Sequence, residues 1–265
     1  MTSTTETGHD KNVANLEDLI SRCTGFGTAF NPSKAALKIP ALNALQTSGR
    51  NVIQALKVAE TAFDNATNTR EIAFNPLKKL CTRIVNSLEV SGATKQTIAD
   101  AITINRKVQG VRATPKKSKN ALDAFIESTH KDAGTDSTGT TTTPVATEPK
   151  QISVSQQSYD SYIDHLTKLI QVISTEPLYT PNETELKVAT LNTTLTNLKS
   201  TNTAVINATT TYSNALLTRN TTLYQPSTGL VDLALEVKKY VKSLFGATSP
   251  QYKQISKIAF RKYKF

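Results

Sequence analysis

The chain has 265 residues, enough for one large domain or two small ones, and its net charge of +10 favours acidic partners such as nucleic acid, an anionic membrane surface or an acidic protein. Only 38% of the residues are hydrophobic, Trp is absent and Met occurs once, so the core must be built mainly from Leu, Ile, Val and Ala, and a large aromatic ligand pocket is not expected. The polar N-terminus lacks a secretory signal pattern and no apolar run is long enough to span a bilayer, so we expect a soluble, cytoplasmic protein with no transmembrane segment.

The first half of the chain spaces its apolar residues as helices do. After a disordered N-terminal tail over residues 1–10, we expect a first helical repeat, residues 11–131, that begins with a short helix. A long helix is predicted over residues 41–67, with a kink or a late start at Pro40. Its apolar and small residues alternate steps of three and four, as in the seam of a coiled coil: Leu42, Leu45, Gly49, Val52, Leu56, Ala59, Phe63 and Ala66. A third helix is predicted to stop at Gly92, and a brief fourth segment leads into a basic end segment.

The second half repeats this order after an interruption. Residues 132–150 are rich in Thr and Gly and lack apolar periodicity, which predicts a flexible linker. A second helical repeat is expected over residues 151–265, with its long helix over 183–217, a helix stop at Gly246 and a basic, aromatic C-terminal tail.

Sequence matches between the halves indicate a tandem duplication. The stretch TAFDNATNTR, residues 61–70, returns as TTYSNALLTR, residues 210–219, and further matches are separated by shifts that fall between the periodic segments. The predicted fold is therefore all-α, made of internally duplicated antiparallel helical bundles with three to four helices per half. We expect residues 11–107 and 156–257 to superpose as copies of one bundle, while the sequence leaves open whether the halves share one core or are separate domains.

Few residues offer catalytic chemistry. Cys23 and Cys81 occupy apolar positions of helical patterns, which predicts buried free thiols. The three histidines have no ligand or base partner at a useful spacing, and the chain carries no metal-binding, phosphate-binding or nucleophile motif. We therefore expect no enzymatic activity, no cofactor and no metal site.

A repeated Thr-Arg pair is the sharpest polar coincidence between the halves. Arg70 and Arg219 end the matched stretches, so they are candidates for a duplicated polar site that clamps an anion or a carboxylate. The competing interpretation is a cation near a helix C-terminus, where the helix dipole favours positive charge. On the first helix of the second half, Tyr159 and Tyr162 fit either an aromatic recognition face or core packing.

Two basic segments close the halves and are the candidate sites for a polyanion or another partner. The first, residues 106–119, has six basic side chains: Arg106, Lys107, Arg112, Lys116, Lys117 and Lys119. The second, residues 253–264, interleaves cations with aromatic residues up to the chain end: Lys253, Lys257, Phe260, Arg261, Lys262, Tyr263, Lys264 and Phe265. Interleaving of this kind suits stacking on nucleic-acid bases, burial at an interface, or an edge strand. A basic tail that only solubilises a helix end remains the alternative.

These observations predict a protein that acts by binding. The leading hypothesis is a non-enzymatic scaffold or interaction protein that binds a protein partner or associates with itself, either through two similar sites or as a pseudo-twofold pair resembling a fused homodimer. The alternative is a nucleic-acid-binding protein that uses the two basic segments.

Overall fold

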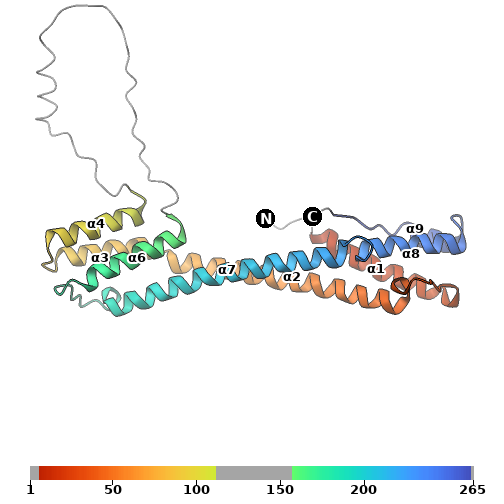
Figure 1. The fold of residues 1–265 in the computed structure, drawn as a ribbon, viewed down its shortest axis with the longest axis horizontal. Coiled ribbons are helices and arrows are strands. Elements are labelled where there is room, and N and C mark those ends of the chain that lie inside the picture. Colours follow the sequence, from red (N-terminus) through yellow and green to blue (C-terminus); the bar gives the residue numbers. More distant parts are fainter. Residues whose placement is uncertain (1–5, 112–156, 264–265) are drawn as a thin grey trace, which may run out of the picture. The chain divides into compact units, whose positions relative to one another are not determined.

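The computed structural model describes residues 6–111 and 157–263, and this part of the chain is all-α, without strands. The first half contains, in order, α1 (Glu6–Gly25), η1 (Gly27–Ala29), η2 (Ala35–Leu37), α2 (Ile39–Phe74), α3 (Leu77–Glu89) and α4 (Lys95–Gln109). The second half contains α6 (Tyr159–Ser174), η4 (Thr184–Leu186), α7 (Val188–Tyr224), α8 (Leu230–Phe245) and α9 (Pro250–Ser256) (Figure 1). None of the described helices has an apolar stretch long enough to cross a membrane.

Helix α1 starts earlier than the sequence predicts. It begins at Glu6, so residues 6–10 are helical and do not belong to a disordered tail. Buried polar side chains explain the extension, because His9 and Asn12 are only 2% and 1% exposed and both contact the hydroxyl group of Tyr224. The sequence prediction relied on the spacing of apolar residues, so it could not detect a helical turn whose buried side chains are polar. The predicted linker 132–150 lies outside the described residues.

The two long helices exceed their predicted lengths at the C-terminal end. Helix α2 has 36 residues and α7 has 37, which correspond to roughly 54 and 55 Å. Pro40 is the second residue of α2, where its missing N–H leaves no bond unmade, so the helix begins before it, at Ile39. The expected late start is therefore wrong, because α7 begins at the matching residue, Val188. Helix α7 begins at Val188 and not at 183, because residues 184–186 form a 3₁₀ turn. Every position of the predicted seam of α2 is buried or half-buried.

Capping residues set the ends of the shorter helices. Thr94, Ser158 and Ser249 each accept a hydrogen bond from a backbone N–H of the first turn of α4, α6 and α9. Gly246 is the C-cap of α8 with φ +88°, as predicted. Gly92 has φ +87° and lies just beyond the end of α3, after Val90. These left-handed conformations favour glycine and explain why both turns carry it.

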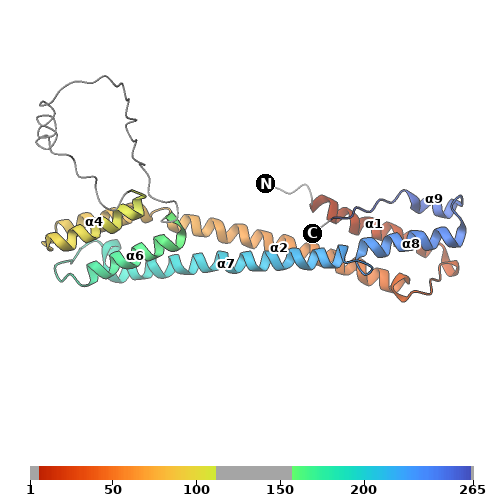
Figure 2. The same ribbon diagram turned by 45° about the horizontal axis from the view of Figure 1, so that its top comes forward.

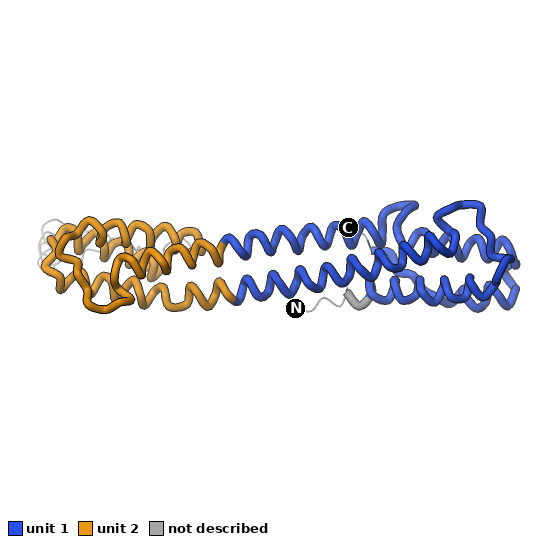
Figure 3. Tube along the Cα trace, turned by 90° about the horizontal axis from the view of Figure 1, so that it is seen from below, with its two compact units in different colours: residues 1–68, 203–265 blue, residues 69–202 orange. Residues whose placement is uncertain are grey.

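The described chain forms two compact units, shown in different colours in Figure 3. Unit 1 consists of residues 1–68 and 203–265, and unit 2 of residues 69–202. The boundary falls inside α2 and α7, both of which run from one unit into the other, and not in the predicted linker.

In unit 1 the core joins the beginning of the chain to its end. Helices α1, α8 and α9 lie together (Figures 1 and 2) and enclose apolar side chains with the first part of α2 and the last part of α7. The largest fully buried residues of this core include Leu16, Leu19, Leu42 and Leu223.

In unit 2 the core joins the end of the first half to the start of the second. Helices α3, α4 and α6 lie together and pack with the last residues of α2 and the first part of α7. Ile84, Leu88, Leu166 and Leu198 are among its fully buried residues. Each core therefore takes the first helix of one half and the third helix of the other.

Candidate functional site

The predicted basic residues fall in both units. Arg106 and Lys107 lie half-buried in the last turn of α4, in unit 2. In unit 1 the predicted cations Lys253, Lys257, Arg261 and Lys262 are all exposed. The other predicted cations and one aromatic residue lie outside the described residues: Arg112, Lys116, Lys117, Lys119, Lys264 and Phe265.

Side chains of α1 hold the C-terminal segment, residues 257–263, against unit 1. The amide of Asn12 donates to the Arg261 carbonyl at 2.8 Å and accepts from the Arg261 N–H at 2.9 Å. Asn15 donates to the carbonyl oxygen of Ala259 at 2.6 Å. Side chains of α1 thus supply hydrogen bonds that a neighbouring strand would otherwise supply to this backbone. The segment is therefore not the edge strand that the sequence left as one alternative.

The aromatic residues of this segment pack on the protein itself. Phe260 and Tyr263 are half-buried against the core of unit 1. The Tyr263 ring lies 4.5 Å from that of His9 and 5.5 Å from that of Tyr224, centroid to centroid. Its hydroxyl fits over Gly8, where a Cβ would come within 1.9 Å of the oxygen. Phe260 and Tyr263 therefore act here as packing residues, and the cations are the exposed part of the segment.

Lysines of α8 extend the basic surface of unit 1 around a cavity of about 430 Å³. Lys238 donates to the carbonyl oxygens of Ser256 and Ile258 at 2.9 and 2.8 Å, and burial lowers its pKa. Lys262 pairs with Asp232 at 2.5 Å, and this bond, with a second from the Ser227 N–H, lowers the pKa of the Asp232 carboxyl group. Lys238 and Lys262 therefore help to hold the C-terminal segment on unit 1.

Arg70 connects three helices of unit 2. Its guanidinium carbon lies 3.9 Å from the centroid of the Tyr159 ring, and its Nη1 donates to the Asn202 side-chain oxygen at 3.2 Å. Asn202 in turn donates to Asp160 at 2.8 Å. Arg70 lies before the last turn of α2. From there it stacks on Tyr159 of α6 and donates a hydrogen bond to Asn202 of α7.

Arg219, the matching residue of the second half, has a different setting in unit 1. It is 6% exposed and donates from Nε and Nη2 to the Asn220 side-chain oxygen at 3.1 and 2.7 Å. Arg70 and Arg219 therefore share a sequence position but not their described hydrogen-bond partners.

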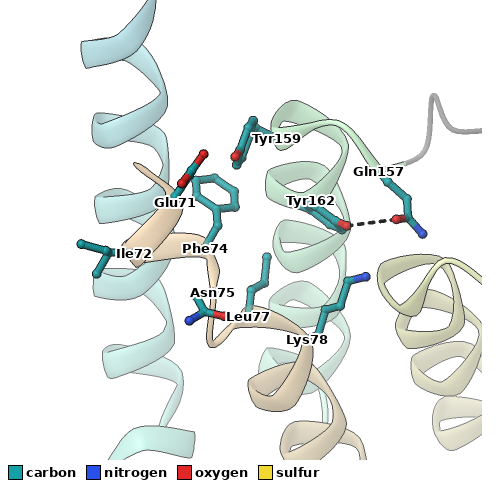
Figure 4. A pocket seen from close by; sticks show the side chains of 9 residues that line it. All are labelled: Glu71, Ile72, Phe74, Asn75, Leu77, Lys78, Gln157, Tyr159 and Tyr162. Atoms are coloured by element: carbon teal, nitrogen blue, oxygen red, sulfur yellow. Dashed lines mark hydrogen bonds between the residues drawn. The ribbon is translucent and has the colours of Figure 1, made fainter. Parts of the chain in front are cut away.

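An open cavity of about 680 Å³ adjoins Tyr159 in unit 2. Figure 4 shows the side chains that line it: Glu71, Ile72, Phe74, Asn75, Leu77, Lys78, Gln157, Tyr159 and Tyr162. Phe74 packs edge-on against Tyr159 with centroids 4.8 Å apart. Lys78 Nζ lies 5.8 Å from the centroid of the Tyr162 ring, and the Tyr162 hydroxyl donates to Gln157 at 3.4 Å. The cavity thus combines aromatic walls with a cation.

The same aromatic contact occurs in unit 1, where it is covered. Phe74 ends α2 and meets Tyr159 of α6, while Tyr224 ends α7 and meets His9 of α1, with centroids 5.4 Å apart. Tyr263 lies against the pair in unit 1, whereas the pair in unit 2 borders the open cavity. The sequence pointed to Tyr159 and Tyr162 but not to the cavity, because its wall from α2 and α3 is distant in sequence.

The remaining chemically active groups have structural settings. Cys23 and Cys81 are free and buried, as predicted, and burial raises the pKa of each thiol to about 12, so both are poor nucleophiles. Within residues 6–111 and 157–263, no three His, Cys, Asp or Glu side chains are grouped to hold a metal ion.

Comparison with known proteins gives no relative. No protein-family model, curated protein or solved structure matches this chain.

Proposed function

We propose that this chain is a non-enzymatic interaction protein, a scaffold built from a duplicated helical unit, and that it binds a protein partner at the open aromatic cavity of unit 2. The observation that carries the proposal is the pair of corresponding aromatic contacts, of which one is covered by the chain's own C-terminal segment and the other is open in the described residues. Protein interfaces favour Tyr and Phe at such positions, because large rigid rings bury apolar area with little loss of entropy.

Two features support a duplicated origin. The described helices follow one order in each half: a first helix, a long helix and two further helices, with a 3₁₀ turn just before each long helix (η2 and η4) and an additional one, η1, in the first half. Several core positions correspond in sequence and are buried in both units: Leu16 and Leu166, Leu19 and Leu169, Leu37 and Leu186, and Leu42 and Leu191. A duplication also accounts for cores that exchange helices between the halves, as a domain-swapped homodimer does. The chain's two cysteines are buried free thiols, which agrees with a location in the cytoplasm, where thiols stay reduced.

Photo-crosslinking tests the proposed function. The full chain carries benzoylphenylalanine in place of Asn75, an exposed residue that lines the cavity, and a matched control carries it in place of Thr193, an exposed residue of α7 that does not line the cavity. We expect irradiation in cells to give a discrete crosslinked protein from the Asn75 position and not from the control. Equal crosslinking from both positions, or none from either, contradicts a protein partner at this cavity.

A second candidate, nucleic-acid binding, rests on the exposed cations of unit 1. Lys239, Lys242, Lys253 and Lys257 are exposed on α8, α9 and the residue that follows α9. Because Phe260 packs on the bundle, this hypothesis predicts binding through phosphates without base stacking by that residue. Replacing Lys253 and Lys257 with Gln is then expected to flatten the dependence of log affinity on log salt by roughly 0.7 to 0.9 per contact removed. If the intact protein binds neither DNA nor RNA at low salt, this candidate fails.

A further inference from the structure

We propose that the cavity of unit 2 binds an extended, acidic segment of a partner protein that carries an aromatic side chain. The inference rests on the proposed function and specifies the chemistry of the partner. It is drawn from what covers the corresponding surface of unit 1 and from the charges that differ between the two surfaces.

Unit 1 shows which kind of chain fits such a surface. There an extended segment runs along the first helix of the unit, and its Tyr263 ring lies on the aromatic contact between Tyr224 and His9. Asn12 bonds both backbone groups of Arg261. The bound element is thus a peptide in extended conformation with an aromatic side chain, and not a helix. The contact between Phe74 and Tyr159 places equivalent walls in unit 2.

The charges beside the two surfaces have opposite signs. Counted from the first residues of α3 and α8, Leu77 and Leu230, the next two residues are Lys78 and Lys79 in unit 2 but Val231 and Asp232 in unit 1. Asp232 pairs with Lys262 of the bound segment. Lys79 holds the position of this carboxylate in unit 2, and its neighbour Lys78, at the position of Val231, lines the cavity. The corresponding side chain of a bound segment must therefore be acidic to make the same ion pair.

Other polar groups of the cavity agree with an extended occupant. Tyr162 occupies the α6 position that matches Asn12 of α1. Its hydroxyl group donates to the Gln157 side-chain oxygen, and both side chains line the cavity. These two polar side chains can therefore hydrogen-bond the backbone of a bound segment, as Asn12 does in unit 1. Glu71 also lines the cavity, but in Figure 4 it lies at the opposite end of the lining residues from Lys78. The acidic side chain is therefore expected next to α3 and the aromatic one next to Phe74.

A pair of peptides tests this chemistry on the full-length protein. The first has the sequence of residues 257–263 with Lys257→Glu, Arg261→Glu and Lys262→Glu, and the second has the unaltered sequence. Fluorescence anisotropy of labelled peptides is expected to show saturable binding of the acidic peptide and at least tenfold weaker binding of the basic one. Preferential binding of the basic peptide would overturn the proposal and point to the C-terminal segment of a second copy as the occupant.

Variants locate the binding to the cavity. We expect Lys78→Glu, Lys79→Glu and Tyr162→Ala each to weaken binding of the acidic peptide at least tenfold, with helical circular dichroism and melting temperature showing that the three variants remain folded. Lys95→Glu is the matched control, because Lys95 is an exposed lysine of unit 2 that does not line the cavity. An equal loss in the Lys95 variant means that the net charge of the protein attracts the peptide, and the proposal is then wrong.

Competition separates this inference from the proposed function. If a protein crosslinks from position 75 and the acidic peptide suppresses the crosslink, both the proposed function and this inference are supported. If the crosslink persists with saturating acidic peptide, or the peptide does not bind, the partner has another chemistry and only the inference fails. Suppression by single-stranded oligonucleotide instead of peptide also overturns the inference, because the aromatic walls would then stack on bases.

Discussion

At the scale of single residues, His165 of α6 is the clearest case of a titratable group whose charge state matters to the fold. Its side chain is buried in unit 2, and Nε2 has no hydrogen-bond partner among residues 6–111 and 157–263. Burial lowers the pKa of its imidazole, the cations Lys107 and Lys168 lower it further, and Asp164 opposes the shift. His165 is therefore neutral in the folded protein at neutral pH.

The lowered pKa predicts a loss of stability in weak acid. Below the ordinary histidine pKa of about 6.5, the unfolded chain binds a proton at residue 165 that the folded chain does not, so the free energy of unfolding falls as pH decreases. We expect urea unfolding at pH 7.5 and 5.5, followed by circular dichroism, to show a smaller decrease for His165→Leu than for the parent chain. The same decrease in both proteins would assign the pH dependence to other groups.

At the scale of elements, α2 shows how tertiary contacts modify a helical seam. Gly49 occupies a seam position and is buried, and a Cβ built on it would lie 3.0 Å from Leu230 Cδ1 and 3.1 Å from Val13 Cγ2. The matching position of α7 is Leu198, which is buried in unit 2. The periodicity predicted the seam of α2 correctly, but it could not predict that α1 and α8 approach α2 closely enough to require glycine.

This close approach predicts the effect of adding one methyl group. Gly49→Ala gains about 1 kcal/mol of helix propensity but overpacks the core, at a cost of about 1–3 kcal/mol, so we expect a net loss of up to about 2 kcal/mol in the free energy of unfolding. Gly25→Ala, at the end of α1, is the matched control, because a Cβ there has no neighbour within 4 Å. Stabilisation of the Gly49 variant, measured by urea titration, would show that Val13 and Leu230 can move aside.

At the scale of the whole molecule, neither half of the sequence contains a complete core. Unit 1 needs α8 from the second half, and unit 2 needs α3 from the first. The single cysteine in each core makes the units separately observable, since Cys23 lies in one and Cys81 in the other. Thiol labelling in denaturant can therefore report which core opens first.

Shared cores predict that the two halves stay together without a covalent link. A protease site introduced within residues 132–150 is expected, after cleavage, to leave two fragments that co-elute in gel filtration, keep their helical circular dichroism and leave both thiols protected. Residues 1–131 expressed alone are expected to label at Cys23 and Cys81, because each thiol then lacks the other half of its core. Separate elution of two helical fragments would instead mean that each half folds alone.

The sequence by itself determined the helices, the seam of α2 and the buried thiols, because these follow from the spacing of apolar residues three and four apart. What only the tertiary structure decided is which helices share a core, and helix lengths give the physical reason. Helix α2 has 36 residues, roughly 54 Å. Leu42 and Ile53 of its first part share a core with α1, whereas only Phe74 and Ala73 at its end pack in the core that contains α3. The two short helices therefore meet different parts of α2 and share no core. Because the sequence predicted a shorter long helix, residues 41–67, it favoured a bundle within each half, whereas the full α2 requires each short helix to find its partner in the other half.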